Sequence, residues 1–126
     1  MRIKTFFLIL SLLFVGAACN QKISQTESVG EVSGIETTQI VMTASGFEPS
    51  DITIKKGTTV TFLNQDIKPR WPASASHPTH TDYPEFDPKQ PVVAGASWSF
   101  TFDRVGKWKF HDHLNPARGG TITVVE

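Results

Sequence analysis

From residue 38 onward, apolar and polar side chains alternate over several short segments, a pattern typical of half-buried β-strands. Ile52 and Ile54 alternate with polar neighbours, as do Trp98, Phe100 and Phe102. No segment in this part of the sequence sustains a helical period, so the pattern predicts an all-β sandwich or barrel. The predicted strands are Thr38–Thr43, Ser50–Lys55, Thr58–Leu63, Ser97–Phe102, Lys107–His111 and Thr121–Val125.

The long segment between Asn64 and Pro91 interrupts this pattern and contains no convincing strand. Six of the eight prolines of the chain fall within it, and proline at this density stiffens an irregular path. The segment also contains Trp71, Tyr83 and Phe86, large aromatic side chains that are costly to leave in water. We therefore expect an ordered loop that folds over one end of the sandwich.

The first 36 residues have a different pattern, which predicts a targeting segment and a tether rather than a part of the folded domain. Residues 1–18 have a basic start, an apolar run and small residues at the end, as in a secretory signal peptide. Cys19 follows directly and resembles the acylated cysteine of bacterial lipoproteins. Residues 19–36 are polar and lack periodicity, which predicts a flexible, lipid-anchored tether with a reach of roughly 20–25 Å. We expect an exported protein, periplasmic or at the cell surface and anchored to a membrane, with residues 37–126 as its folded domain.

Composition and charge exclude several classes of function. The 126 residues contain twelve basic and twelve acidic side chains, and removal of residues 1–18 takes away two of the basic ones. A chain with this balance and no basic block lacks the clustered Lys and Arg that nucleic acid binding requires. A single cysteine excludes an internal disulfide framework and any multi-cysteine zinc or iron–sulfur site.

The four histidines form two close pairs, and this is the strongest chemical signal in the sequence. His111 and His113 lie at the end of a predicted strand, where side chains two residues apart point to the same face. His77 and His80 lie in the proline-rich loop, with Pro78 between them. Neutral imidazole binds copper, zinc, nickel and iron, so the two pairs predict one shared metal site. The structural alternative is two hydrogen-bonded histidine pairs that shape the loops.

Three carboxylates near these histidines are candidates to complete or tune the site. Glu85 and Asp87 lie in the proline-rich loop and are possible additional ligands, although a turn or cap role is the usual one for an Asp before a proline. Asp112 lies between the paired histidines and should point away from them if the strand persists. We expect it to be solvated or to orient a ligand ring.

The domain resembles the cupredoxins, the superfamily of plastocyanin and azurin. The similarity runs from Gly46-Phe47-Glu48-Pro49 through Asn64 and Asp66, resumes at Ala94–Phe100, and continues to the last predicted strand. It implies a Greek-key β-sandwich that holds copper at one end, between the loop after Asn64-Gln65-Asp66 and the loop before the last strand.

The sequence departs from the cupredoxin pattern at the copper ligands themselves. Blue copper proteins carry a Cys where this chain has His111, and a Met follows in the next loop, where this chain has none. The first histidine of the family falls near Arg70 or Trp71, neither of which binds copper, so His77 and His80 are its candidate replacements. Without the thiolate that tunes a blue copper site, the electron-shuttle role of the family does not transfer directly.

These observations support several functions, of which copper binding, buffering or delivery outside the cytoplasm is the first. Cu(II) leads the divalent stability order, and zinc is the alternative ion. The second function is electron transfer at a thiolate-free copper centre, and the third is a small copper-dependent oxidoreductase, which needs an open coordination position and a substrate pocket. A metal-free interaction module is the fourth. The expected partners are the metal ion, the membrane through the anchor, and a redox or copper-handling protein.

Overall fold

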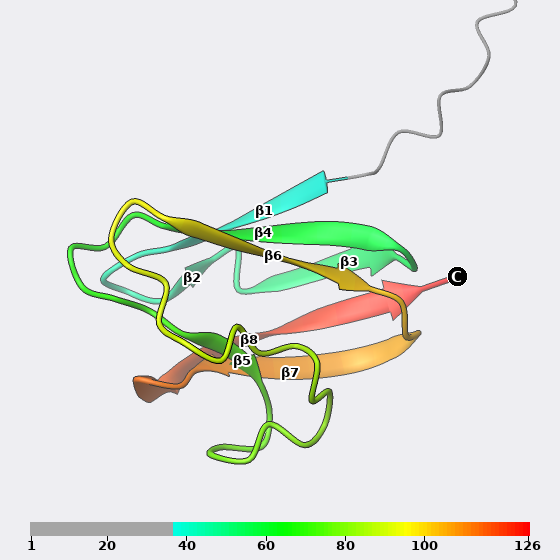
Figure 1. Ribbon diagram of the computed structural model, residues 1–126. Helices are drawn as coiled ribbons and strands as arrows, with labels where there is room; N and C mark the ends of the chain where they lie inside the picture. The colour runs from blue at the N-terminus through cyan, green and yellow to red at the C-terminus, as the bar shows by residue number, and fades with distance from the viewer. Residues whose placement is uncertain (1–36) are drawn as a thin grey trace, which may run out of the picture. The chain divides into compact units, whose positions relative to one another are not determined.

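The computed structural model describes residues 37–126, which form two four-stranded sheets (Figure 1). One sheet has the strand order β2-β1-β4-β6 and the other has the order β3-β8-β7-β5. Strands β1 and β4 are parallel, as are β3 and β8, and the other neighbours are antiparallel. The strands are β1 (Thr37–Met42), β2 (Phe47–Glu48), β3 (Asp51–Lys55), β4 (Thr58–Asn64), β5 (Pro72–Ser74), β6 (Ser97–Phe102), β7 (Gly106–Asp112) and β8 (Asn115–Val125).

The core lies between the two sheets and follows from the period-2 pattern of the strands. In β4, Val60 and Phe62 are fully buried. Phe62 makes an edge-to-face contact with Phe110 of β7, with 5.8 Å between ring centroids, and Phe110 makes another with Phe47 at 4.8 Å. Such aromatic pairs stabilise a core beyond the area that they bury. The predicted β-sandwich is confirmed.

All six predicted strands are present, with ends that differ by a few residues, but two short strands were missed. The two-residue strand β2 and the three-residue strand β5 are too short for a periodic pattern to be detected. The expectation of no strand between Asn64 and Pro91 is therefore wrong at β5. Pro72 begins this strand, and β5 is at the edge of its sheet, which is where a β-sheet tolerates proline.

The segment after β5 packs against the sandwich through two aromatic side chains. Tyr83 and Phe86 are both fully buried. The Phe86 ring lies 5.0 Å from that of Phe102 and 5.5 Å from that of Phe62, measured between centroids. The Ser74 amide donates to the Phe86 carbonyl over 2.9 Å. These contacts fix the segment that carries His77 and His80, which is visible below β5 and β7 in Figure 1.

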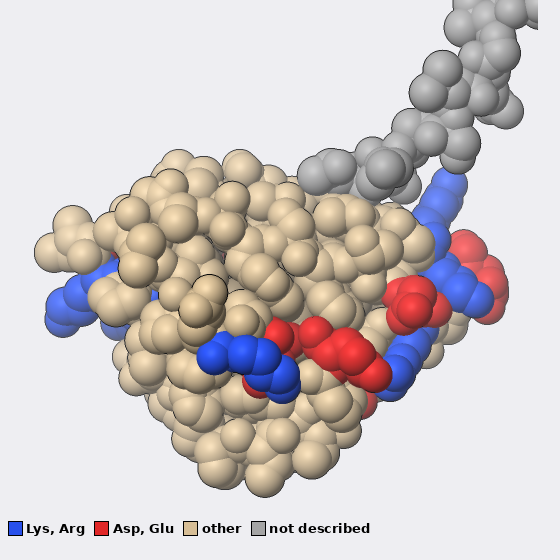
Figure 2. Space-filling view, in the orientation of Figure 1, with Lys and Arg blue, Asp and Glu red and all other residues tan. Residues whose placement is uncertain are grey.

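The described residues include no helix long and apolar enough to cross a membrane. On the face shown in Figure 2, charged side chains form small groups, some of mixed sign, and most of the surface between them is uncharged. This face therefore presents no continuous field of Lys and Arg.

We predict that Phe86→Ala destabilises the domain by about 3–5 kcal/mol, because it removes a large ring from a fully packed core. Ile67→Ala is the matched control, since Ile67 is 90% exposed, and should change the stability by less than about 0.5 kcal/mol. Urea unfolding of both variants measures the difference. Equal stability of the two variants would show that the loop is not part of the core. If Phe86→Ala does not fold, Phe86→Leu gives the smaller loss.

Candidate metal centre

The end of β7 positions His111 and His113. His111 is paired with Ala73 of β5 on one side and with Gly119 of β8 on the other, and the register shifts between His111 and Asp112. Gly119 permits this close pairing, since a Cβ there would lie 2.2 Å from the Phe110 carbonyl oxygen. His111 is buried between its neighbours and His113 is half-buried.

The segment after β5 positions His77 and His80. The His80 amide donates to the Ser76 carbonyl over 2.7 Å. The backbone of His80 has a φ of 53°, the left-handed conformation that few residues other than glycine adopt. His80 is buried, whereas His77 is exposed.

The structure brings all four histidines together. One nitrogen from each ring lies within 4.8 Å of the others, and this is the group of metal-binding side chains found in residues 37–126. His77 Nδ1 lies 3.3 Å from His111 Nε2, and His80 Nε2 lies 2.9 Å from His113 Nδ1. Ligands at about 2.0–2.1 Å from one ion lie about 2.8–3.4 Å apart when adjacent. The four rings therefore fit a single metal ion with nitrogen ligands.

Asp87 orients His80. Its Oδ2 lies 2.7 Å from His80 Nδ1, and its Oδ1 accepts a 2.8 Å hydrogen bond from Trp71 Nε1. Burial opposes ionisation of Asp87, but hydrogen bonds from Trp71, His80 and Lys89 outweigh it and hold the pKa of Asp87 below its usual range. Because an ionised carboxylate only accepts hydrogen bonds, His80 Nδ1 carries the proton. This leaves the lone pair of Nε2 facing the cluster, as in other histidine ligands that donate to a carboxylate.

Trp71 fixes His113 through both its backbone and its ring. The His113 amide donates to the Trp71 carbonyl over 2.8 Å. The indole and imidazole rings lie against each other, with 4.6 Å between centroids. Since the same indole donates to Asp87, Trp71 links the restraints on His113 and His80.

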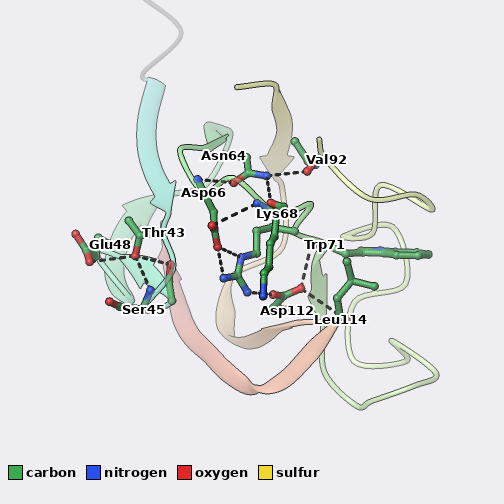
Figure 3. Close-up of polar contacts among 12 residues, drawn as sticks. Thr43, Ser45, Glu48, Asn64, Asp66, Lys68, Trp71, Val92, Asp112 and Leu114 are labelled. Atoms are coloured by element: carbon green, nitrogen blue, oxygen red, sulfur yellow. Dashed lines mark hydrogen bonds and ion pairs between the residues drawn. The ribbon is translucent and has the colours of Figure 1, made fainter. Parts of the chain in front are cut away.

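Asp112, which separates His111 from His113, is part of a buried ion network. Its Oδ2 accepts a 2.8 Å hydrogen bond from Arg70 Nη1, and its Oδ1 accepts from the amides of Trp71 and Leu114. The guanidinium of Arg70 also binds Asp66 through Nε and Nη2, which lowers the pKa of Asp66. Figure 3 shows Asp66 and Asp112 pointing toward each other, and the hydrogen bonds of Asp112 to Trp71 and Leu114. We define Asp66, Arg70 and Asp112 as the ion triad.

The three candidate carboxylates thus differ in how they lie relative to the histidine cluster. Of the two roles expected for Asp112, solvation is wrong, because the residue is almost fully buried. Its hydrogen bonds go to Arg70 and to backbone amides rather than to a ligand ring. Asp87 contacts the cluster through His80. Glu85 does not join the cluster and forms an exposed 2.8 Å ion pair with Arg104.

Sequence reasoning missed the ion triad, although a signal was present. Arg70 and Trp71 lie between Pro69 and Pro72, and an arginine in a stiff loop beside an aromatic residue suggests a defined partner. Where the cupredoxin pattern has its first histidine, this chain has an arginine that binds two carboxylates and a tryptophan that packs on His113.

The environment of the cluster keeps the rings of His111 and His113 neutral. Burial, together with the neighbouring His80, His77 and His113, lowers the pKa of His111 to about 4. Burial and the neighbouring rings also lower the pKa of His113. Neutral imidazole is the form that binds a metal, so both rings are ready to bind at neutral pH.

Comparisons with known proteins agree with this fold. The family model of the cupredoxin-like domain matches residues 6–124, and the chain belongs to this family. No significant match is found among curated proteins.

Several solved structures are similar to this chain. A purple cupredoxin from Nitrosopumilus maritimus has 25% identity and a TM-score of 0.61, and the match covers 70% of this chain and 99% of that one. A copper-containing nitrite reductase from Thermus scotoductus SA-01 has 23% identity and a TM-score of 0.62, covering 71% of this chain and 22% of the reductase. A mutant amicyanin in the Cu(I) form has 18% identity and a TM-score of 0.60, covering 71% and 82%.

We predict that the metal-free protein loses stability as the pH falls from about 6.5 to about 4. In this window the unfolded chain takes up a proton at residue 111 while the folded state, whose His111 pKa is about 4, does not. The loss from this residue amounts to about 3 kcal/mol. Urea unfolding in the presence of a chelator measures it, and His111→Gln should flatten the dependence. An NMR titration that places the His111 pKa near 6.5 would contradict the prediction.

Proposed function

We propose that this protein is an exported, membrane-anchored copper protein that binds one copper ion through His77, His80, His111 and His113, and that it buffers or delivers copper outside the cytoplasm. The observation that carries the proposal is the convergence of four ring nitrogens within 4.8 Å in a cupredoxin sandwich. The proposal does not depend on the metal ligands of the three similar structures described above.

The donor set favours copper over zinc. Among divalent ions, Cu(II) binds nitrogen ligands most tightly, and imidazole suits both copper and zinc. The chain has one cysteine, at position 19, and no methionine beyond Met42, so the thioether and thiolate of a blue copper site are lacking in residues 43–126. A bound copper ion supplies a one-electron couple, and zinc supplies none.

The residues of this chain have separate roles at the centre. Asp87 keeps the proton of His80 on Nδ1 and directs Nε2 inward. The strand pairing of β7 holds His111, and Trp71 holds His113 and covers one side of its ring. Together these contacts preform three of the four ligands before an ion arrives, which lowers the cost of ordering them.

Electron transfer at a thiolate-free copper centre is the second candidate, and the preformed cluster favours it because little rearrangement would accompany a change of charge. For an enzyme, the described residues offer less support. A groove of about 790 Å³ is lined by residues that include Gln65, Lys68, Leu114 and Arg118. None of the four histidines lines it.

We predict that the protein binds one copper ion with a nitrogen-only electron paramagnetic resonance spectrum and without an intense thiolate charge-transfer band. Copper at a thousandfold excess over Kd should stabilise the fold by roughly 4 kcal/mol. His111→Ala and His113→Ala should each abolish tight binding measured by calorimetry.

Glu85→Gln is the control for these variants, because Glu85 lies in the loop of His77 and His80 but outside the cluster. The copper affinity of this variant should equal that of the wild type. Unchanged affinity in both histidine variants would disprove a shared site. Tighter binding of zinc than of copper would change the proposed ion.

Export and anchoring rest on residues 1–36, which lie outside the described part of the chain. If Cys19 is acylated, as its place after Gly16-Ala17-Ala18 indicates, the protein should partition into membranes, because several acyl chains together hold firmly. Cys19→Ala should release the protein or block its processing. Recovery of the wild-type protein entirely in the soluble fraction, without added lipid mass, would show an ordinary secreted domain.

A further inference from the structure

Three of the four histidines are held by residues outside the cluster. His80 is bonded to Asp87, and its side chain is buried. His111 lies within β7 and is paired to strands on both sides. The amide of His113 donates to the Trp71 carbonyl, and its ring packs against the indole. The strand pairing and burial of His111, and the contacts of His80 and His113, thus restrain these three residues whether or not an ion is bound.

His77 differs from the other three in both exposure and contacts. It is the exposed member of the cluster, and its neighbours Ser76, Pro78 and Thr79 are exposed as well. Its ring contacts the rings of His111 and His113, with centroids 5.1 and 4.8 Å away. Within residues 37–126, no hydrogen bond joins His77 to a residue outside the cluster. Its position depends on the other histidines and on any ion they share.

We propose that the centre is a three-plus-one site in which His80, His111 and His113 hold the ion and His77 is an exchangeable ligand. This inference rests on the proposed copper-binding function and adds the route by which the ion is transferred. When His77 turns outward, the ion stays on three fixed nitrogens and presents one coordination position to solvent. A monodentate donor from a metal-donating or metal-accepting protein, such as an imidazole, then replaces His77.

The difference in restraint explains why exchange occurs at this position. Displacing His80 would break its bond to Asp87 and leave a buried carboxylate without that partner, which costs free energy. Displacing His113 would separate it from Trp71. Displacing His77 breaks no hydrogen bond to a described residue outside the cluster and moves an exposed side chain further into water.

The test uses the full-length protein loaded with copper, with His77→Ala and His80→Ala as a matched pair. Copper content, the rate of release into an excess of chelator, and the electron paramagnetic resonance spectrum are measured with and without added imidazole. We expect His77→Ala to retain one copper per chain and to release it faster, on the order of tenfold. Imidazole should restore a four-nitrogen spectrum and slow the release.

His80→Ala should lose tight binding, and imidazole should not restore it, because the position of the His80 ring is enclosed and only 5% exposed in the wild type. The variants His77→Gln and His80→Gln repeat the comparison if either alanine variant is poorly folded by circular dichroism. Equal loss of copper from the His77 and His80 variants would overturn the three-plus-one site, as would a His77→Ala spectrum that imidazole does not change. Wild-type protein that binds no copper would instead refute the proposed function itself.

Discussion

The pairing of Arg70 with Asp112 is the constraint on which the metal centre depends. It joins residues 42 positions apart, one in the loop after β4 and one at the end of β7. Both side chains are buried, and a buried charge that loses its partner costs about 3–5 kcal/mol. Because Asp112 lies between His111 and His113 and also accepts the Trp71 amide, the pairing fixes both the end of β7 and the segment that leads to the other histidine pair.

The proposed nitrogen-only ligand set gives the carboxylates around it an electrostatic role. A thiolate would neutralise one charge of a bound ion, whereas four neutral imidazoles leave the full charge in a half-buried position. Asp112 shares Arg70 with Asp66, so the ion triad keeps a net charge of −1 beside His111 and His113. Asp87 is shared between His80 and the exposed Lys89, and salt and water screen the contribution of an exposed lysine. Asp87, acting through the His80 ring, and the ion triad therefore both supply compensating negative charge near the centre.

The sequence predicted the parts of the structure that depend on local periodicity. The alternation of apolar and polar residues in Thr58–Leu63 or Ser97–Phe102 predicts a strand and its buried face. The two-residue spacing of His111 and His113 predicts that their side chains converge. The pairing of β5 with β7, which brings His77 and His80 to the other pair, involves three residues that begin with Pro72 and has no period to detect. The ion pair between Arg70 and Asp112 could not be predicted either, because no local sequence pattern encodes a contact between residues 42 positions apart.

The four histidines are restrained to different degrees, and this difference bears on whether such a centre transfers an electron or delivers its ion. An electron-transfer site works best when all ligands keep their positions in both oxidation states, whereas a delivery site must release its ion to another protein. In this protein the contacts of Asp87, Trp71 and β7 immobilise three rings, and the fourth ring lies in an exposed segment with no comparable support. His77 lies at the surface while the other three histidines are buried or half-buried, and under the proposed function that asymmetry favours transfer of the ion over transfer of an electron.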